Sequence, residues 1–445
     1  MGTFILQGER VVFPDGERPG SLYITDNQIK AVGRRHQFAG YEELIDVGAS
    51  VIMPGMIDVH VHINEPGRTE WEGFETATKA AAFGGTTTLV DMPLNSTPVT
   101  TTIENFQQKL DAAEGKLAVN VAYHAGVIPD HVEQLDQLLA MGAIAGKAFM
   151  IDSGMEDFPF ADRDTLREAM FVLKKHGKPL LAHGELELNL DLPNTPWTKF
   201  SDYLSSRPQA METAAVKMLI ELCEETKCAV HLVHLSATEP LAMLRSARER
   251  GLPITVETSP HYLFLASEDI ADGQTQFKCA PPIRERANRA VLRKALLNGD
   301  IDLVGTDHSP CPPGLKNLES GDFATAWGGI SSLQYMLPIV WSSMREIGGT
   351  PADLARWLCQ NPAEMLGLDQ LGTLEKGKTA DIIVWDPDEE FIVDPSETLH
   401  RHKLTPYDGC KLMGKVQQTI LGGRTIFKDG IIINSEFGKS LMKNS

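Results

Sequence analysis

Eight short apolar runs recur along the middle of the chain, each bounded by glycine, proline or polar residues. Within each run the apolar residues are nearly continuous rather than alternating with polar ones. This pattern is typical of strands that are buried on both faces of a parallel sheet. The runs are VIMPGMIDVHVH, TTTLVDMPL, AVNVAYHAGV, AIAGKAFMI, KPLLAHGE, AVHLVHLS, PITVETSPHYL and IDLVGTDHSP.

Helical patterns separate most of these runs, as in residues 73–85, 162–177 and 238–251. The last two segments begin with Asp or Thr and end with Gly, which are the usual signals of helix ends. Strands that alternate with helices predict an α/β fold. Eight such units in a row favour a (β/α)8 barrel, which we place at residues 51–371, over an open doubly wound sheet.

The two ends of the chain have a different pattern. Residues 1–50 and 372–445 contain short β-prone segments interrupted by Gly and Asp, and their helical periodicity is weak. We expect both ends to combine into one small β-sandwich domain that flanks the barrel.

Composition limits which binding partners and which cellular compartment we expect. The chain has 445 residues and a net charge of −19, which argues against nucleic acid and anionic membrane surfaces as partners. Its six cysteines include no C-x-x-C pair and do not suggest a disulfide framework. The first residues lack the features of a signal peptide, and no apolar stretch approaches the roughly 18 residues of a membrane-spanning helix. We therefore expect a cytoplasmic protein.

Two histidines, His60 and His62, close the first apolar run. In a strand, residues two positions apart point to the same face, so both imidazoles leave it together. Neutral imidazole is the commonest metal ligand in proteins, and a shared divalent ion would compensate the crowding of two titratable rings. On this pair alone, a metal site and a purely structural role are equal alternatives.

Other polar residues stand at the ends of later runs. Catalytic groups of a parallel barrel gather where its strands end, so these residues would meet the first two histidines at one mouth. Two divalent ions about 3.5–4 Å apart would employ all of these side chains as ligands. Its further members are Lys147, His183, His234 and Asp307.

Lys147 is the unusual member, because an ammonium group cannot bind a cation and is costly to bury. Carbon dioxide can convert a neutral lysine into a carbamate, whose two oxygens could bridge two ions. Taken alone, Lys147 is more simply an exposed side chain or an ion-pair partner. Its position at a strand end, in register with four histidines, favours the carbamate.

The segments DVHVH, GKAFM, AHGE, VHLS and GTDHSPCP resemble the cyclic amidohydrolases, the family that includes dihydroorotases, hydantoinases and allantoinases. The resemblance spans nearly the whole chain and implies a metal-dependent hydrolase of cyclic amides with a barrel and a divided β-sandwich. From the types of ligand, zinc is the expected metal, although manganese, cobalt or iron also suit such ligands. By position, it assigns the first ion to His60, His62 and Asp307, the second ion to His183 and His234, and the bridge to carboxylated Lys147. It also implies that Asp307 carries the proton during catalysis.

The residues at four positions help to distinguish between the substrates of this family. A dihydroorotase would have Arg at position 64 to bind the substrate carboxylate, but this chain has Asn64. It also has Leu94, Ala280 and Cys311 where that pattern has Asn, Asn and His. The segments DMPLNSTP, TDHSPCPP, AWGGI and PGRTEWEGF instead resemble allantoinases. Allantoin is a hydantoin with a ureido group and no carboxylate, so an Arg anchor would have no partner.

The resemblance thus implies hydrolysis of allantoin to allantoate by a homo-oligomer, either a dimer or a tetramer. Asn64 and Asn95 are candidates for substrate contact, because amide side chains suit amide and urea groups. A structural turn is an equal alternative for Asn95, as is a structural role for His261, the third candidate. Two rivals stay open: a hydantoinase or dihydropyrimidinase with the same metals, and an inactive scaffold of the same fold.

The remaining conspicuous residues receive structural interpretations. His231 lies three residues before His234, and we expect it to pack in the core on the opposite face of the strand. His308 follows Asp307 and should support the site from behind. Trp71 and Trp327 are expected to line the mouth of the barrel.

Overall fold

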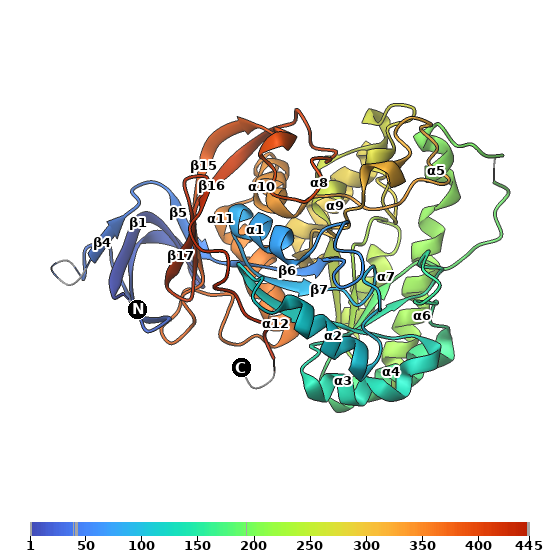
Figure 1. Ribbon diagram of the computed structural model, residues 1–445, viewed down its shortest axis with the longest axis horizontal. Coiled ribbons are helices and arrows are strands. Elements are labelled where there is room, and N and C mark those ends of the chain that lie inside the picture. The colour runs from blue at the N-terminus through green and yellow to red at the C-terminus, as the bar shows by residue number, and fades with distance from the viewer. Residues whose placement is uncertain (1, 39, 41–42, 193, 443–445) are drawn as a thin grey trace.

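The computed structural model describes residues 2–38, 40, 43–192 and 194–442. Figure 1 shows two parts: a sheet built from both ends of the chain at one side, and parallel strands surrounded by helices at the other. None of the helices in the described residues combines the length and apolar character needed to cross a bilayer. The six cysteines are all free thiols.

Each of the eight predicted runs contributes at least one strand, and the strands of the middle of the chain pair in parallel. Three of them form one sheet: β6 (Met56–Val61), β7 (Thr86–Asp91) and β8 (Asn120–Tyr123). Six form a second sheet: β9 (Ala125–Gly126), β10 (Gly146–Phe149), β11 (Leu180–His183), β12 (Val230–Leu232), β13 (Ile254–Thr258) and β14 (Leu303–Val304). All six residues of β6 are buried, as expected for a strand covered on both faces.

Backbone hydrogen bonds connect the two parallel sheets at both edges. At one edge, the amide of Ile144 donates to the carbonyl of Tyr123 at 2.9 Å. At the other, the amide of His62 donates to the carbonyl of His308 at 2.9 Å, beside a parallel bridge between Val61 and His308. The segment that follows β14 is therefore held directly against the end of β6.

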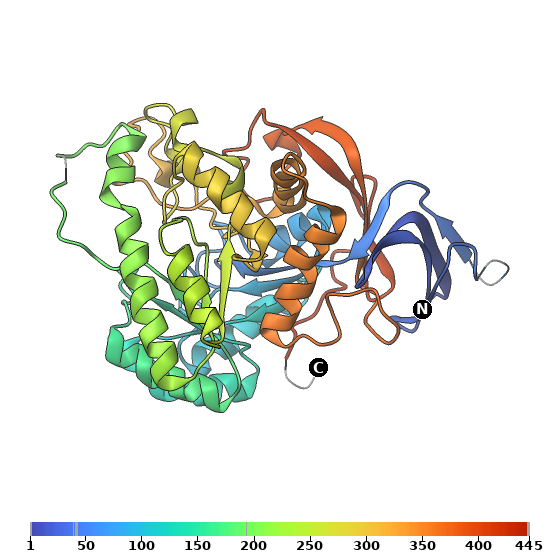
Figure 2. The same ribbon diagram turned by 180° about the vertical axis from the view of Figure 1, so that it is seen from behind.

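Helices follow the strands and cover their outer side, as the green and yellow helices in Figure 2 illustrate. The predicted helix at 162–177 is α4, in which the Asp162 side chain accepts from the Thr165 amide and a buried stripe faces the strands. The other predicted helices correspond to α1 and α7. The helices are α1 (Phe74–Gly84), α2 (Ile103–Ala113), α3 (Leu135–Met141), α4 (Arg163–Lys175), α5 (Phe200–Ser206), α6 (Gln209–Thr226), α7 (Leu241–Glu249), α8 (Pro260–Phe264), α9 (Arg286–Asn298), α10 (Met336–Arg345), α11 (Pro351–Ala355) and α12 (Asn361–Leu366).

The two chain ends share a nine-stranded sheet. Its junction is the antiparallel pairing of β5 with β15, in which Met53 lies opposite Ile383. This pairing brings segments more than 300 residues apart in the sequence side by side. The strands are β1 (Phe4–Phe13), β2 (Gly16–Thr25), β3 (Gln28–Gly33), β4 (Glu43–Asp46), β5 (Val51–Pro54), β15 (Ile382–Ile392), β16 (Lys411–Leu421), β17 (Arg424–Lys428) and β18 (Ile431–Ile432).

Candidate metal centre and active site

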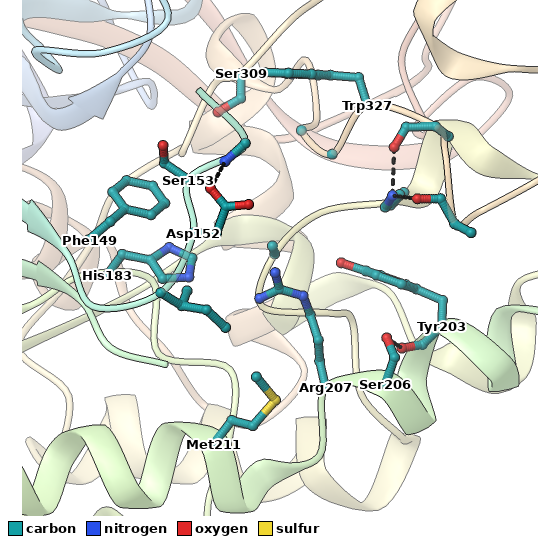
Figure 3. A pocket seen from close by; sticks show the side chains of 18 of the residues that line it. Phe149, Asp152, Ser153, His183, Tyr203, Ser206, Arg207, Met211, Ser309 and Trp327 are labelled. Carbon is teal, nitrogen blue, oxygen red and sulfur yellow. Dashed lines mark hydrogen bonds between the residues drawn. The ribbon is translucent and has the colours of Figure 1, made fainter. Parts of the chain in front are cut away.

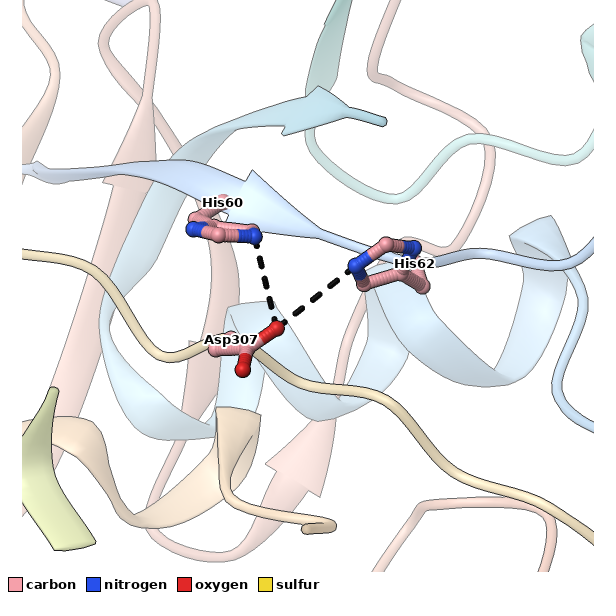
Figure 4. Close-up of side chains that lie close together, drawn as sticks. All are labelled: His60, His62 and Asp307. Carbon is pink, nitrogen blue, oxygen red and sulfur yellow. Dashed lines mark ion pairs between the residues drawn. The ribbon is translucent and has the colours of Figure 1, made fainter. Parts of the chain in front are cut away.

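His60, His62 and Asp307 meet where β6 and β14 end. The Nε2 atoms of His60 and His62 lie 3.3 Å and 3.5 Å from the same carboxylate oxygen, Oδ1 of Asp307 (Figure 4). All three side chains are buried, and one potential ligand atom from each lies within 4.8 Å of the others. Two imidazole nitrogens and a carboxylate oxygen are suitable ligands for a divalent metal ion. The group can therefore hold one.

His183 and His234 form a second pair beside this group. Their ring centroids are 4.6 Å apart, and the ring of His234 also stacks on that of His60 at 5.2 Å. Burial lowers the pKa of both His183 and His234 well below 6.5. Both rings are therefore neutral at physiological pH, the form in which imidazole binds metal.

Lys147 lies in β10 and is completely buried. Its Nζ has no hydrogen-bond partner among the described residues and lies 5.0 Å from the centroid of the Phe149 ring. Burial lowers its pKa from 10.5 to about 8. A buried ammonium without a partner is costly, so this position suits a neutral amine or a carbamate that binds metal. The donor set as a whole thus fits divalent ions.

Asp307 is held in a constrained conformation. Its backbone φ of 46° lies in the left-handed region, which non-glycine residues rarely adopt. The hydroxyl of Ser309 donates to its Oδ1 at 2.9 Å. Burial alone would raise the pKa of Asp307, but the neighbouring His60 and His62 outweigh this effect and hold it well below 3.8. The carboxylate is therefore ionised and aimed at the imidazoles.

A cavity of about 950 Å³ opens over this cluster. Figure 3 shows part of its wall, with Phe149, His183, Arg207 and Trp327 among the labelled side chains. Five of the six predicted metal-site residues line it, namely His60, His62, His183, His234 and Asp307. The sixth, Lys147, is not among the lining residues, and its Nζ lies over the ring of Phe149, which is one of them. The cavity is far larger than a single five-membered ring, so it can admit a substrate with a side group.

The three predicted substrate residues lie in different surroundings. Asn95 lines the cavity, and its Nδ2 lies 3.1 Å from Nδ1 of His62. Asn64 has a φ of 66° and donates to the carbonyl of Pro310 at 3.3 Å. His261 is completely buried against Tyr262. Within the described part of the chain, the cavity lining includes neither Asn64 nor His261. Of the three candidates, the geometry therefore favours Asn95 for direct contact with a substrate.

The aromatic residues expected at the mouth are arranged as a pair. Trp327 lines the cavity, and the ring of Trp71 packs edge-on against it at 4.8 Å. Leu94 and Ala280, two of the positions that distinguish the substrate, also line the cavity, whereas Cys311 is buried outside the lining.

Comparison with known proteins identifies the family. The sequence model of the amidohydrolase family matches residues 51–426. The chain belongs to the amidohydrolase family. It is 43% identical over 428 residues to the allantoinase of Streptomyces avermitilis, with 96% of each chain covered. It is 41% identical over 446 residues to the allantoinase of Arabidopsis thaliana, covering 96% of this chain and 88% of the relative.

A solved structure gives the same result. The L-hydantoinase (dihydropyrimidinase) from Arthrobacter aurescens superposes with a TM-score of 0.93 and 27% identity, and the match covers 100% of both chains. The resemblance to cyclic amidohydrolases inferred from the motifs is therefore confirmed.

The amidohydrolase site contains a buried carboxylate, Glu257, that the sequence patterns did not identify. Its Oε1 accepts from Nδ1 of His60 at 2.8 Å and from the backbone amide of His234 at 3.1 Å. Hydrogen bonds of this kind orient metal-binding imidazoles. The only sequence signal is a charged residue within the apolar run PITVETSPHYL.

His231 also contacts this carboxylate: its Nε2 lies 3.2 Å from Oε2 of Glu257. The predicted burial of His231 is confirmed. The prediction that it points away from the side of His234 is wrong, because the carboxylate that it contacts also bonds to His60, whose ring stacks on that of His234. The strand alternation fails because β12 ends at Leu232 and His234 adopts a φ of 39°.

His308 supports the amidohydrolase site as expected. Besides accepting the amide of His62 with its carbonyl, it uses both ring nitrogens: Nε2 lies 3.2 Å from a carboxylate oxygen of Glu72, and Nδ1 accepts from the amide of Ser332 at 3.1 Å. These bonds fix the backbone of the residue that follows Asp307.

Proposed function

We propose that this amidohydrolase is an allantoinase, which hydrolyses the cyclic amide of allantoin to allantoate. The observation that carries the proposal is the combination of the site with its relatives. Four imidazoles and the Asp307 carboxylate line one cavity, in a chain 43% identical to a protein named allantoinase over 96% of its length. Asn64, in place of the arginine that would bind a carboxylate, agrees with an uncharged substrate.

We propose that the centre holds two divalent ions, with zinc as the expected metal. The first would be bound by His60, His62 and Asp307, the second by His183 and His234, and both by carboxylated Lys147. The unpartnered Nζ of Lys147 and its pKa of about 8 support this assignment, because carbon dioxide reacts with the neutral amine. When bound, such ions lower the pKa of water and polarise a carbonyl oxygen.

Asp307 would transfer the proton. Its low pKa keeps it ionised and able to act as a base, and it lines the cavity beside His60 and His62. As water attacks the ring carbonyl carbon, Asp307 accepts a proton from the water. When the carbon–nitrogen bond breaks, it returns that proton to the leaving ring nitrogen. Asn95 is our candidate for direct contact with the substrate, whereas Asn64 and His261 would support the site from outside the cavity lining.

A panel of cyclic amides tests the proposal. The protein, reconstituted with zinc and bicarbonate, is assayed in parallel with allantoin, hydantoin, dihydrouracil and dihydroorotate, and allantoin is expected to give the highest kcat/KM. A hydantoinase or dihydropyrimidinase is the second candidate, favoured by the likeness to the Arthrobacter structure, and a preference for hydantoin or dihydrouracil would support it. No turnover of any amide by protein with both ions bound would indicate a scaffold.

We also propose the finer organisation of the chain. Residues 51–371 would form a closed (β/α)8 barrel, and residues 1–50 and 372–445 a β-sandwich domain, with β5 at the junction. The hydrogen bonds at both edges of the two parallel sheets support the barrel. A cytoplasmic location and a homo-oligomeric assembly stay predictions; the six free thiols agree with a reducing compartment.

A further inference from the structure

One carboxylate, that of Glu185, joins a proposed metal ligand to a cation in the cavity wall. Its Oε2 accepts from Nε2 of His183 at 2.7 Å and also from Nη1 of Arg207. Glu185 is completely buried two residues after the end of β11, whereas Arg207 lines the cavity. The three side chains thus form a continuous connection from the cavity wall to the metal centre.

Arg207 is itself well held. It lies between α5 and α6, and its carbonyl accepts from Nη1 of Arg284 at 3.1 Å. Arg284 in turn pairs with Glu212 through a buried contact of 2.5 Å. Figure 3 shows the Arg207 side chain extending between His183 and Tyr203. These contacts hold the backbone of Arg207 in place, and its guanidinium binds Glu185 from this position.

These contacts decide which nitrogen of His183 is available. Since Nε2 is bonded to Glu185, Nδ1 is the nitrogen left for a metal ion. The ring of Phe149 stacks on His183 at 4.3 Å and limits tilting of the imidazole plane. The bond to Glu185 limits rotation within that plane. Fixing the second nitrogen in this way typically changes metal affinity by 10–100-fold.

We propose that Arg207 is a positioning residue for the second metal ion. By binding Glu185, it holds the carboxylate where it keeps Nδ1 of His183 directed at the centre. Arg207 also compensates the charge of a carboxylate that is costly to bury alone. This inference rests on the proposed two-ion centre, but it does not depend on which cyclic amide is hydrolysed.

The test measures zinc binding by full-length, chelator-treated protein in zinc-buffered solutions, without any activity assay. Arg207→Met, which removes the charge and the donors, should weaken the second zinc by about 10–100-fold and leave the first nearly unchanged. Arg207→Lys, which keeps a charged donor, should recover part of the affinity. Arg248→Met is the matched control: Arg248 is 22% exposed, against 21% for Arg207, and pairs with Asp302, and among the described residues neither member of this pair lines the cavity. It should bind both ions normally.

The outcomes separate this inference from the proposed function. Two ions in the wild type, with both retained at unchanged affinity by Arg207→Met, would overturn the role of Arg207 alone. Fewer than two ions in the wild type would overturn the two-ion centre and this inference with it. Should Arg207→Met fail to fold, Glu185→Ala carries the test: selective loss of the second ion supports the inference, and normal binding of both overturns it.

Discussion

The Nδ1 atom of His60 lies 2.8 Å from Oε1 of Glu257, and the two side chains are 1% and 0% exposed. This bond turns the opposite nitrogen, Nε2, toward Asp307. Because the same carboxylate oxygen accepts the amide of His234, Glu257 links a residue of the first proposed ligand set to one of the second. The distance between the two proposed sets of metal ligands therefore depends on Glu257.

Replacing Glu257 should weaken metal binding without removing a ligand. In Glu257→Gln the side chain keeps its shape but loses its charge, so His60 is held less firmly, and zinc affinity should fall by about 10–100-fold. Zinc retained after dialysis against a chelator measures the effect. Asp381→Asn is the control, since Asp381 is also buried but accepts from the backbone amide of Gly422, next to the sheet of the chain ends. Wild-type zinc retention in Glu257→Gln would contradict the orienting role.

Lys147→Ala should lose most activity and retain fewer than two ions per chain, because alanine cannot supply a bridging carbamate. Metal content and turnover are measured on the same preparation, grown with zinc and bicarbonate. Lys278→Met serves as the control: Lys278 also lines the cavity, but its Nζ donates to the carbonyl of Ala326 at 2.6 Å. Full activity and full metal content in Lys147→Ala would show that no carbamate is needed.

The reactivity of Lys147 should depend on pH in a defined way. Burial lowers its pKa to about 8, so the amine is charged below that pH and neutral above it. Only the neutral amine reacts with carbon dioxide. Reactivation of stripped protein by zinc, at fixed dissolved carbon dioxide, should therefore accelerate about tenfold from pH 7 to 9 and then level off. A rate still rising steeply above pH 9 would indicate an ordinary lysine pKa.

Allantoin should be hydrolysed with a kcat/KM at least about a hundredfold above that for dihydroorotate, roughly 2.7 kcal/mol of transition-state stabilisation. The dihydroorotate carboxylate would meet Leu94 and Ala280 in the cavity rather than asparagines. The chain also has Asn64 rather than an arginine that could reach this carboxylate. Burying that charge without a partner accounts for the difference. Parallel steady-state assays on one preparation check it, and equal efficiency on both substrates would refute the allantoinase assignment.

Asp307→Asn separates proton transfer from metal binding. Asparagine keeps the shape and can keep an oxygen on the metal, but it cannot accept the proton. Since general acid–base catalysis contributes about 10²–10⁴-fold, kcat should fall by that range while KM changes much less. Zinc is quantified in the same sample. Near-normal kcat with both ions bound would exclude the proton-transfer role, and a loss explained by missing metal would leave Asp307 as a ligand only.

Much of this arrangement follows from local sequence patterns. Near-continuous apolar runs predicted the parallel strands, because burial on both faces removes the alternation of polar residues. His60 and His62 could be paired from their spacing alone, since neighbours two apart in a strand share a face. The remaining candidates followed from the rule that parallel strands end on one side. These are short-range or topological constraints that each segment carries by itself.

The orientation of the site was decided by tertiary structure. Glu257 stands in the sequence as a single acid in an apolar run, and only packing places it against His60, 197 residues away. Glu185 follows His183 by two residues, but its contact with Arg207 also depends on packing. Alternation also misassigned the face of His231, because the strand ends before His234 and the backbone turns into the left-handed region. Sequence spacing determines direction only while the backbone stays regular. Beyond a strand end, side-chain direction depends on contacts between residues far apart in the chain.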